Sequence, residues 1–211
     1  MNCINIFFLQ IPEPISFGSP IGFYVLISVA VLIIFIKLRN ASYFKNIMNL
    51  VFSDSQQFDP SLQTNAGNIN SVFLQISYIL LVSLGLTYAF ESNPSFLNYS
   101  VTLFKVLILY LFQVIGFYLI SSMINLKTES FHRNRFVINE VNALFLFVAL
   151  FLIIYLPIKV TGVIHALLGL SAIFNLIGSS RYLASNISNF HIILYLCTLE
   201  IIPVLLLLKF I

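Results

Sequence analysis

Six long apolar runs, separated by short polar connections, organise the sequence. Each run comes close to the roughly 20 residues that a helix needs to cross a bilayer. The pattern therefore predicts an all-α fold, a polytopic bundle of about six transmembrane helices in a single domain that takes up residues 1–211. The predicted spans are about 20–36, 69–90, 101–124, 138–158, 162–178 and 190–211.

The fifth run is the weakest of the six. Its apolar part, Ile164 to Ile177, is short for a full span, and the run holds several polar and glycine positions. Two interpretations stay open. The run is either a full span, which gives six crossings, or a re-entrant or partly interfacial helix, which gives five. The positions that weaken it are His165, Gly169, Ser171, Asn175 and Gly178.

The basic residues favour one orientation in the membrane. Cytoplasmic loops of membrane proteins carry an excess of Lys and Arg. Loops one, three and five, at 37–68, 125–137 and 179–189, hold seven basic residues between them, whereas the opposite side holds only Lys159 and Lys209. We therefore expect those three loops in the cytoplasm and both termini on the periplasmic side. The seven are Lys37, Arg39, Lys45, Lys127, Arg133, Arg135 and Arg181.

Loop one contains an amphipathic segment at about 41–52. Phe44, Ile47, Met48 and Val51 recur at helical spacing, and Lys45 lies on the other side with two asparagines. Such a pattern is typical of a helix lying in the membrane interface. The segment is either a linker that rests on lipid or a docking element for a partner, so Phe44 and Lys45 are candidate interface residues.

Loop three ends in a string of alternating basic and aromatic residues, Phe131 to Phe136. Each cation near an anionic inner leaflet contributes about 1 kcal/mol to membrane binding. Arg133 and Arg135 are therefore candidates for anchoring at the cytoplasmic interface. Glu140 follows at the expected mouth of the fourth span, where the helix macrodipole favours a carboxylate near a helix N-terminus.

Composition agrees with a membrane protein. Hydrophobic residues make up 60% of the chain and charged residues 8%, with a mean hydropathy of +1.02. A soluble domain has about 45–50% apolar and about 25% charged residues. Six spans leave no room for a soluble catalytic or nucleic-acid-binding domain, so the expected surroundings are the lipid bilayer and other membrane proteins, without nucleic acid.

The sequence carries no recognised catalytic or cofactor motif. It lacks a glycine-rich phosphate loop and the His-Glu-x-x-His and Gly-x-Ser-x-Gly patterns. Cys3 and Cys197 lie far apart without metal-ligand spacing. We therefore expect no cofactor and no metal, and an enzymatic role is less favoured than a non-enzymatic one.

Glu200 is the polar residue that stands out inside a span. A charge at mid-membrane costs roughly 2.5–3.5 kcal/mol on insertion scales, so Glu200 needs a compensating partner or a proton. Pro203 leaves the carbonyl of Leu199, beside Glu200, without its helical partner. A kinked polar notch is expected here, and it serves either as a clamp between helices or as a proton-carrying or ligand-binding site. Its remaining polar members are Tyr195, Cys197 and Thr198.

Two ionisable residues in other spans are candidate partners of Glu200. Lys105 lies near the start of the third run and His165 near the start of the fifth, so both are expected in the outer half of the bilayer. Contact with Glu200 requires that these helices pack together. Lys105 could equally extend its ammonium group to the outer surface.

The closing segment Leu194 to Pro203, with the sequence LYLCTLEIIP, resembles that of a Bacteroidota membrane family, domain of unknown function 4271. The similarity extends over most of the chain, including the region of Phe44 and the stretch from Phe136 to Pro157. The resemblance implies an inner-membrane protein of a Gram-negative bacterium. It implies no particular activity, substrate or cofactor.

Two classes of function follow. The preferred one is a non-enzymatic subunit or assembly factor of an inner-membrane complex, with envelope biogenesis or protein export as its setting. The alternative is a small proton-linked transporter or an intramembrane enzyme that uses Glu200. Discontinuous helices meeting at mid-membrane would favour the alternative, and Pro203 is the one such break in the polar region of a span.

Overall fold

The computed structural model describes residues 20–45, 47, 65–91, 94–123, 128–155 and 160–186, and every element within these ranges is helical. The predicted all-α fold is confirmed. The long helices are α1 (Pro20–Arg39), α3 (Asn65–Phe90), α4 (Phe96–Met123), α5 (Thr128–Tyr155) and α6 (Val160–Asn186).

Four of these helices contain a stretch long and apolar enough to cross a membrane. Each of the first four predicted runs lies largely within one of the four stretches. The fifth run lies in α6, whose apolar part, Gly162–Asn175, is shorter than a span. The sixth run, 190–211, lies outside the described residues, and six crossings stay a prediction. The four stretches are Pro20–Arg39, Ile69–Phe90, Phe96–Gly116 and Phe136–Tyr155.

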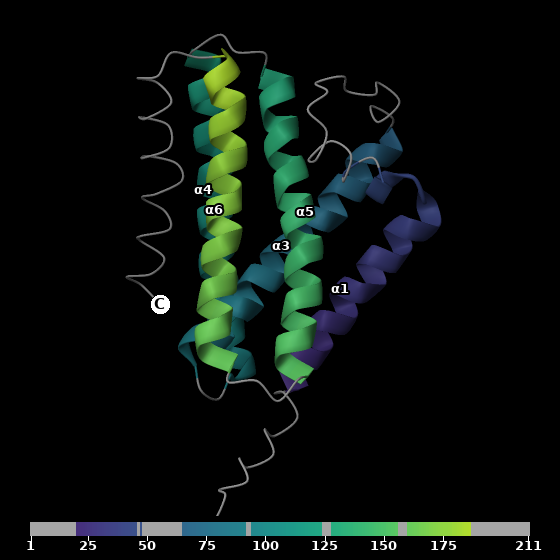
Figure 1. Ribbon diagram of the computed structural model, residues 1–211, viewed down its shortest axis with the longest axis vertical. Helices are drawn as coiled ribbons and strands as arrows, with labels where there is room; N and C mark the ends of the chain where they lie inside the picture. Colours follow the sequence, from purple (N-terminus) through teal and green to yellow (C-terminus); the bar gives the residue numbers. More distant parts are fainter. Residues whose placement is uncertain are drawn as a thin grey trace, which may run out of the picture.

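Successive helices run in opposite directions, as Figure 1 shows. The end of α1, the start of α3, the end of α4, the start of α5 and the end of α6 therefore share one end of the bundle, the upper end in that view. This end carries the connections that hold most of the basic residues. We call it the basic end.

Local chemistry sets the helix ends. Pro20 opens α1, where its fixed φ suits the first helical position. Lys37 and Arg39 occupy the last turn of α1, where positive charge complements the macrodipole. Ser95 caps α4, because its Oγ accepts a hydrogen bond from the backbone N–H of Asn98 at 3.2 Å.

The described helices extend beyond their apolar runs, and the start of α5 and the end of α6 extend furthest. The polar residues from Thr128 onward continue α5 towards the basic end, so the Phe131 to Phe136 string lies in a helix rather than in a loop. Helix α6 likewise continues to Asn186, which places Arg181 within α6. Once a helix has formed, each further residue adds one backbone hydrogen bond. Both helices therefore continue through polar turns beyond the apolar part of their sequences.

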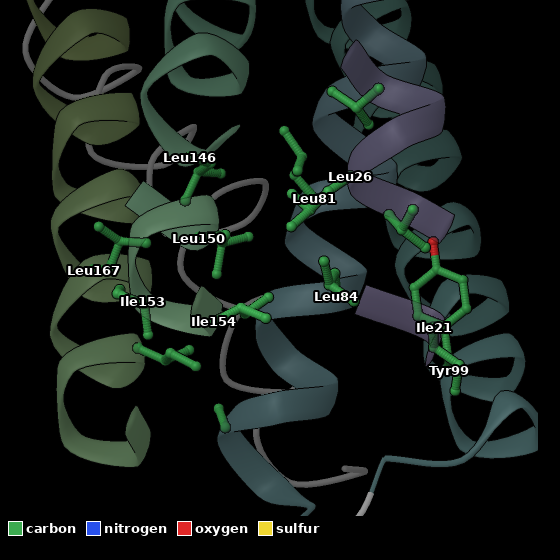
Figure 2. Close-up of a cluster of buried hydrophobic side chains, with 14 of the residues drawn as sticks. Ile21, Leu26, Leu81, Leu84, Tyr99, Leu146, Leu150, Ile153, Ile154 and Leu167 are labelled. Atoms are coloured by element: carbon green, nitrogen blue, oxygen red, sulfur yellow. The ribbon is translucent and has the colours of Figure 1, made fainter. Parts of the chain in front are cut away.

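Helices α3 and α5 form the centre of the bundle, and each of them contacts all the other long helices. In their spans 56% and 61% of the residues are buried, against 11% in α4. Figure 2 shows the largest core cluster, where Leu81 and Leu84 of α3 lie near Leu150 and Ile154 of α5. Helix α4 therefore lies at the periphery and presents most of its apolar side chains outward.

The amphipathic segment of loop one packs partly onto protein. Its described part is helical at Tyr43 to Lys45 and at Ile47. Tyr43 and Ile47 are buried, and they belong to a second core cluster with Ile36 of α1, Leu74 of α3 and Val141 of α5. Phe44 is half-buried and Lys45 is exposed. Within the described part, loop one therefore docks onto the basic end of the bundle.

Candidate functional site

A layer of polar side chains lies inside the bundle, in the half next to the basic end. Its members come from loop one, from the first half of α3 and from the middle parts of α4, α5 and α6, which the alternating helix directions bring to one level. We call this set the polar layer. It comprises Tyr43, Asn70, Ser71, Gln75, Tyr78, Tyr110, Asn139, Glu140, Asn142, Ser171 and Asn175.

Glu140 is the central acid of this layer. Its side chain is only 2% exposed. The Tyr43 hydroxyl donates a hydrogen bond to Glu140 Oε2 at 3.0 Å, and the Ser71 hydroxyl donates one to Oε1. An intramolecular hydrogen bond contributes about 0.5–1.5 kcal/mol, so these two bonds help to offset the cost of burying the carboxyl group. They also join loop one and α3 to α5.

Gln75 forms a second node about one helical turn from Ser71. Its Oε1 accepts hydrogen bonds from the Tyr110 hydroxyl at 2.9 Å and from Asn139 Nδ2 at 3.2 Å. Its Nε2 donates to the backbone carbonyl of Phe136 at 2.9 Å. The side chain of Gln75 thus joins α3 to both α4 and α5, and the oxygen and the nitrogen of its amide group both have hydrogen-bond partners.

Two further bonds tie α6 to the same layer. Asn142 Nδ2 donates to the backbone carbonyl of Ser171 at 3.4 Å, and Asn175 Nδ2 donates to the Tyr78 hydroxyl at 3.1 Å. A polar group without a partner is costly in an apolar bundle. The layer therefore fixes the relative register of α3, α4, α5 and α6.

Asn70 is the exception in this layer. Its side chain is fully buried, and neither Nδ2 nor Oδ1 has a hydrogen-bond partner. Asn70 lies one turn from Leu74 on the same side of α3, and Leu74 packs with Tyr43 in the second core cluster. Burial of an amide without a hydrogen-bond partner costs free energy, so Asn70 destabilises the layer that the other bonds hold together.

The family match covers nearly the whole chain. The family model described as "Domain of unknown function (DUF4271)" matches residues 22–211, a range that includes the closing segment Leu194 to Pro203. The chain belongs to the DUF4271 family. No curated protein and no solved structure matches the chain. The resemblance that the closing segment carries is thus confirmed at the level of the family.

In this DUF4271 chain the expectation for Glu140 as a carboxylate at a helix N-terminus is wrong. Helix α5 begins at Thr128, about three turns before Glu140. The polar residues after Thr128 extend the helix beyond the apolar run, so the macrodipole at the N-terminus does not act on Glu140. The residue lies instead in the interior, where hydroxyl groups surround its carboxyl group.

Lys105 and His165 lie in the half of the bundle opposite the polar layer. Lys105 is half-buried about two and a half turns into α4, and His165 is exposed little more than one turn into α6. The imidazole ring of His165 meets the ring of Phe90 edge to face, with centroids 5.4 Å apart. Neither residue therefore belongs to the group around Glu140.

The other candidates lie where the structure gives no side-chain description. Arg133 and Arg135 are within the helical backbone of α5, and nothing is described of their side chains. The notch residues Glu200, Tyr195, Cys197, Thr198 and Pro203 lie outside the described residues. Among the residues that are described, no group of His, Cys, Asp and Glu side chains is placed to hold a metal ion.

Sequence reasoning missed most of the polar layer, although a signal for it exists. Ser71, Gln75 and Tyr78 recur at intervals of four and three residues within an apolar run, which places them along one side of α3. Ser171 and Asn175 have the same four-residue spacing in α6. Polar residues that repeat at helical spacing within a span indicate contact with other helices rather than with lipid.

Proposed function

We propose that this protein is a non-enzymatic integral subunit or assembly factor of an inner-membrane protein complex, with envelope biogenesis or protein export as its setting. The observation that carries the proposal is the binding of Glu140 by two hydroxyl groups from separate segments. A carboxyl group held on both oxygens and 2% exposed acts as a clamp between helices. A substrate-binding carboxyl group needs access that this arrangement does not provide.

The outer face of α4 supports a role in assembly. The exposed apolar residues of this helix repeat at helical spacing over its central turns, and they include two phenylalanines. In a bilayer such a face meets lipid or a helix of another membrane protein. We propose that part of this face contacts a helix of another membrane protein. The face consists of Phe104, Leu107, Ile108, Leu111, Phe112 and Ile115.

The proposed location is the inner membrane of a Gram-negative bacterium, in the group Bacteroidota. The proposed orientation has the basic end of the bundle in the cytoplasm and both termini in the periplasm. Support for the orientation comes from the distribution of Lys and Arg, since seven of the ten lie in the last turn of α1, in the two connections before α3 and α5, or in the polar turns of α5 and α6 nearest the basic end. The polar layer would then lie in the cytoplasmic half of the membrane.

The test is affinity purification of the tagged full-length chain in mild detergent, followed by quantitative mass spectrometry. The expected result is at least one membrane protein recovered reproducibly in a fixed ratio to the bait. A Phe104→Ala/Phe112→Ala variant should recover less of that protein. A matched Phe23→Ala/Val31→Ala variant on the exposed face of α1 should recover it as the wild type does. Repeated recovery of a lone chain would contradict the proposal.

One observation favours the second candidate, a proton-linked transporter or intramembrane enzyme that uses Glu200. The buried amide of Asn70 has no hydrogen-bond partner among the described residues, and polar groups inside a membrane bundle mark proton pathways as well as helix contacts. Proton flux in proteoliposomes would decide the matter. If this candidate is right, Glu200→Gln abolishes proton flux although the variant still folds. The control Tyr24→Phe, on the exposed face of α1, leaves the flux unchanged.

A further inference from the structure

One side of α6 is a continuous exposed stripe. Gly162, Ala166, Gly169, Ile173 and Ile177 recur every three or four residues, so they lie above one another along the helix, and all five are exposed. We call these five residues the α6 stripe. The opposite side of the helix is buried against α3 and α5. The stripe is therefore the side of α6 that the described helices leave open.

The small residues of the stripe leave room for a close approach. A Cβ atom placed at Gly162 or at Gly169 would meet no atom within 4 Å, whereas one at Gly85 in the core would lie 3.1 Å from Leu168. Small residues in membrane helices let the backbone of a second helix come near. The stripe can therefore accommodate the large side chains of a neighbouring helix.

The chain itself supplies such a helix. Helix α6 ends at Asn186, and the last predicted span begins at about residue 190, so only residues 187–189 separate the two. Helices joined by so short a connection pack beside each other and antiparallel. We propose that the predicted span 190–211, which lies outside the described residues, packs antiparallel on the α6 stripe.

Chain length gives the register of this pairing. Counting in opposite directions from Asn186 and Phe190 sets Leu207 opposite Gly169 and Phe210 opposite Ala166. Leu207 and Phe210 are three positions apart, and so are Ala166 and Gly169. A leucine therefore lies opposite Gly169, where a Cβ atom would meet open space, and a phenylalanine lies opposite the small side chain of Ala166.

The same register places Glu200 along the bundle. Glu200 is about 15 Å along the span from Phe190, at the level of Ile173 to Ile177 on α6. This is the level of the polar layer. His165 lies about 17 Å further from the basic end, beyond the reach of a glutamate side chain. The pairing therefore removes His165 from the candidate partners of Glu200.

Disulfide cross-linking in native membranes tests the pairing. In a full-length chain with Cys3 and Cys197 changed to serine, Gly169→Cys is combined with single cysteines from Val204 to Ile211. Peptide mass spectrometry without reduction should find an intramolecular disulfide with its maximum within one turn of Leu207. With Ala166→Cys the maximum should move about three positions towards the C-terminus, as an antiparallel pair requires. Val31→Cys on α1 is the control and should give no disulfide.

Three outcomes would overturn the proposal. Disulfides between two copies of Gly169→Cys would show that a second chain occupies the stripe. A maximum that moves towards the N-terminus with Ala166→Cys would exclude the antiparallel register. Absence of any disulfide in both series, from variants that purify as monodisperse protein, would assign the stripe to lipid or to another protein.

Discussion

The Tyr43 hydroxyl donates a hydrogen bond to Glu140 Oε2 at 3.0 Å, although the two residues are 97 positions apart in the sequence. Tyr43 belongs to the segment between α1 and α3, and Glu140 belongs to α5. The bond therefore fixes the beginning of loop one to a central helix. Because Ser71 binds the other carboxylate oxygen, Glu140 also joins α3 to the same point.

Removal of the Tyr43 hydroxyl should destabilise the protein without changing the shape of its core. Tyr43→Phe keeps the ring in the second core cluster and leaves Glu140 with one hydroxyl donor fewer. We expect a loss of about 1–3 kcal/mol in the free energy of unfolding. Thermal unfolding in detergent measures it. Tyr24→Phe at an exposed position of α1 is the matched control and should unfold at the wild-type temperature.

Replacement of Glu140 should reveal how much of its role is hydrogen bonding. Glu140→Leu leaves the hydroxyls of Tyr43 and Ser71 without their acceptor, at a cost of about 1–3 kcal/mol for each. Glu140→Gln keeps one acceptor oxygen and should recover part of the loss. The measurement is the yield of monodisperse protein after extraction from membranes. Equal yields for Glu140→Leu and the wild type would argue against a clamp.

A tight contact between α1 and α3 gives a further test of the packing. A Cβ atom at Gly22 would lie 2.6 Å from the Tyr88 hydroxyl oxygen, but 3.4 Å from the nearest ring carbon. We expect Gly22→Ala to cost about 1–3 kcal/mol, as overpacking does, and to cost less when Tyr88→Phe removes that oxygen. Gly162→Ala, where a Cβ meets open space, should be close to neutral. The measurement is the free energy of unfolding in detergent for the wild type, Gly22→Ala, Tyr88→Phe, the Gly22→Ala/Tyr88→Phe double variant and Gly162→Ala.

The orientation in the membrane is open to direct labelling. With Cys3 and Cys197 changed to serine, Gln57→Cys in loop one should react only after the membrane that holds the protein is made permeable. Asn98→Cys, between the second and third predicted spans, should react in intact spheroplasts with a reagent that does not cross membranes. The reverse result at either position would contradict the charge-based orientation.

Much of the fold could be predicted because it depends on the hydrophobic pattern alone. The first five apolar runs lie largely within helices α1, α3, α4, α5 and α6, since a helix satisfies the backbone polar groups of an apolar segment internally. The helix ends are harder to predict from the sequence. Thr128 and Asn186 lie in polar stretches, where hydropathy does not report how far a helix continues.

The contacts within the polar layer could not be predicted, because they depend on which helices are neighbours. Glu140 interacts with residues 97 and 69 positions away, and Gln75 with Tyr110 at a separation of 35. One sequence gives the side of a helix on which each of these residues lies, but not the helix that it faces. For Lys105 and His165 the half of the bundle follows from their places near the starts of the predicted runs, but the helix that each of them faces does not.

The clamp between loop one and α5 is tested most directly by a double-mutant cycle on Tyr43 and Glu140. The free energy of unfolding in mixed micelles is measured for the wild type, Tyr43→Phe, Glu140→Leu and the double variant. Tyr43→Phe should cost about 1–3 kcal/mol in the wild type and almost nothing in the Glu140→Leu background, where the hydroxyl has already lost its acceptor. An equal cost in both backgrounds would show that the two residues act independently, which would contradict the clamp.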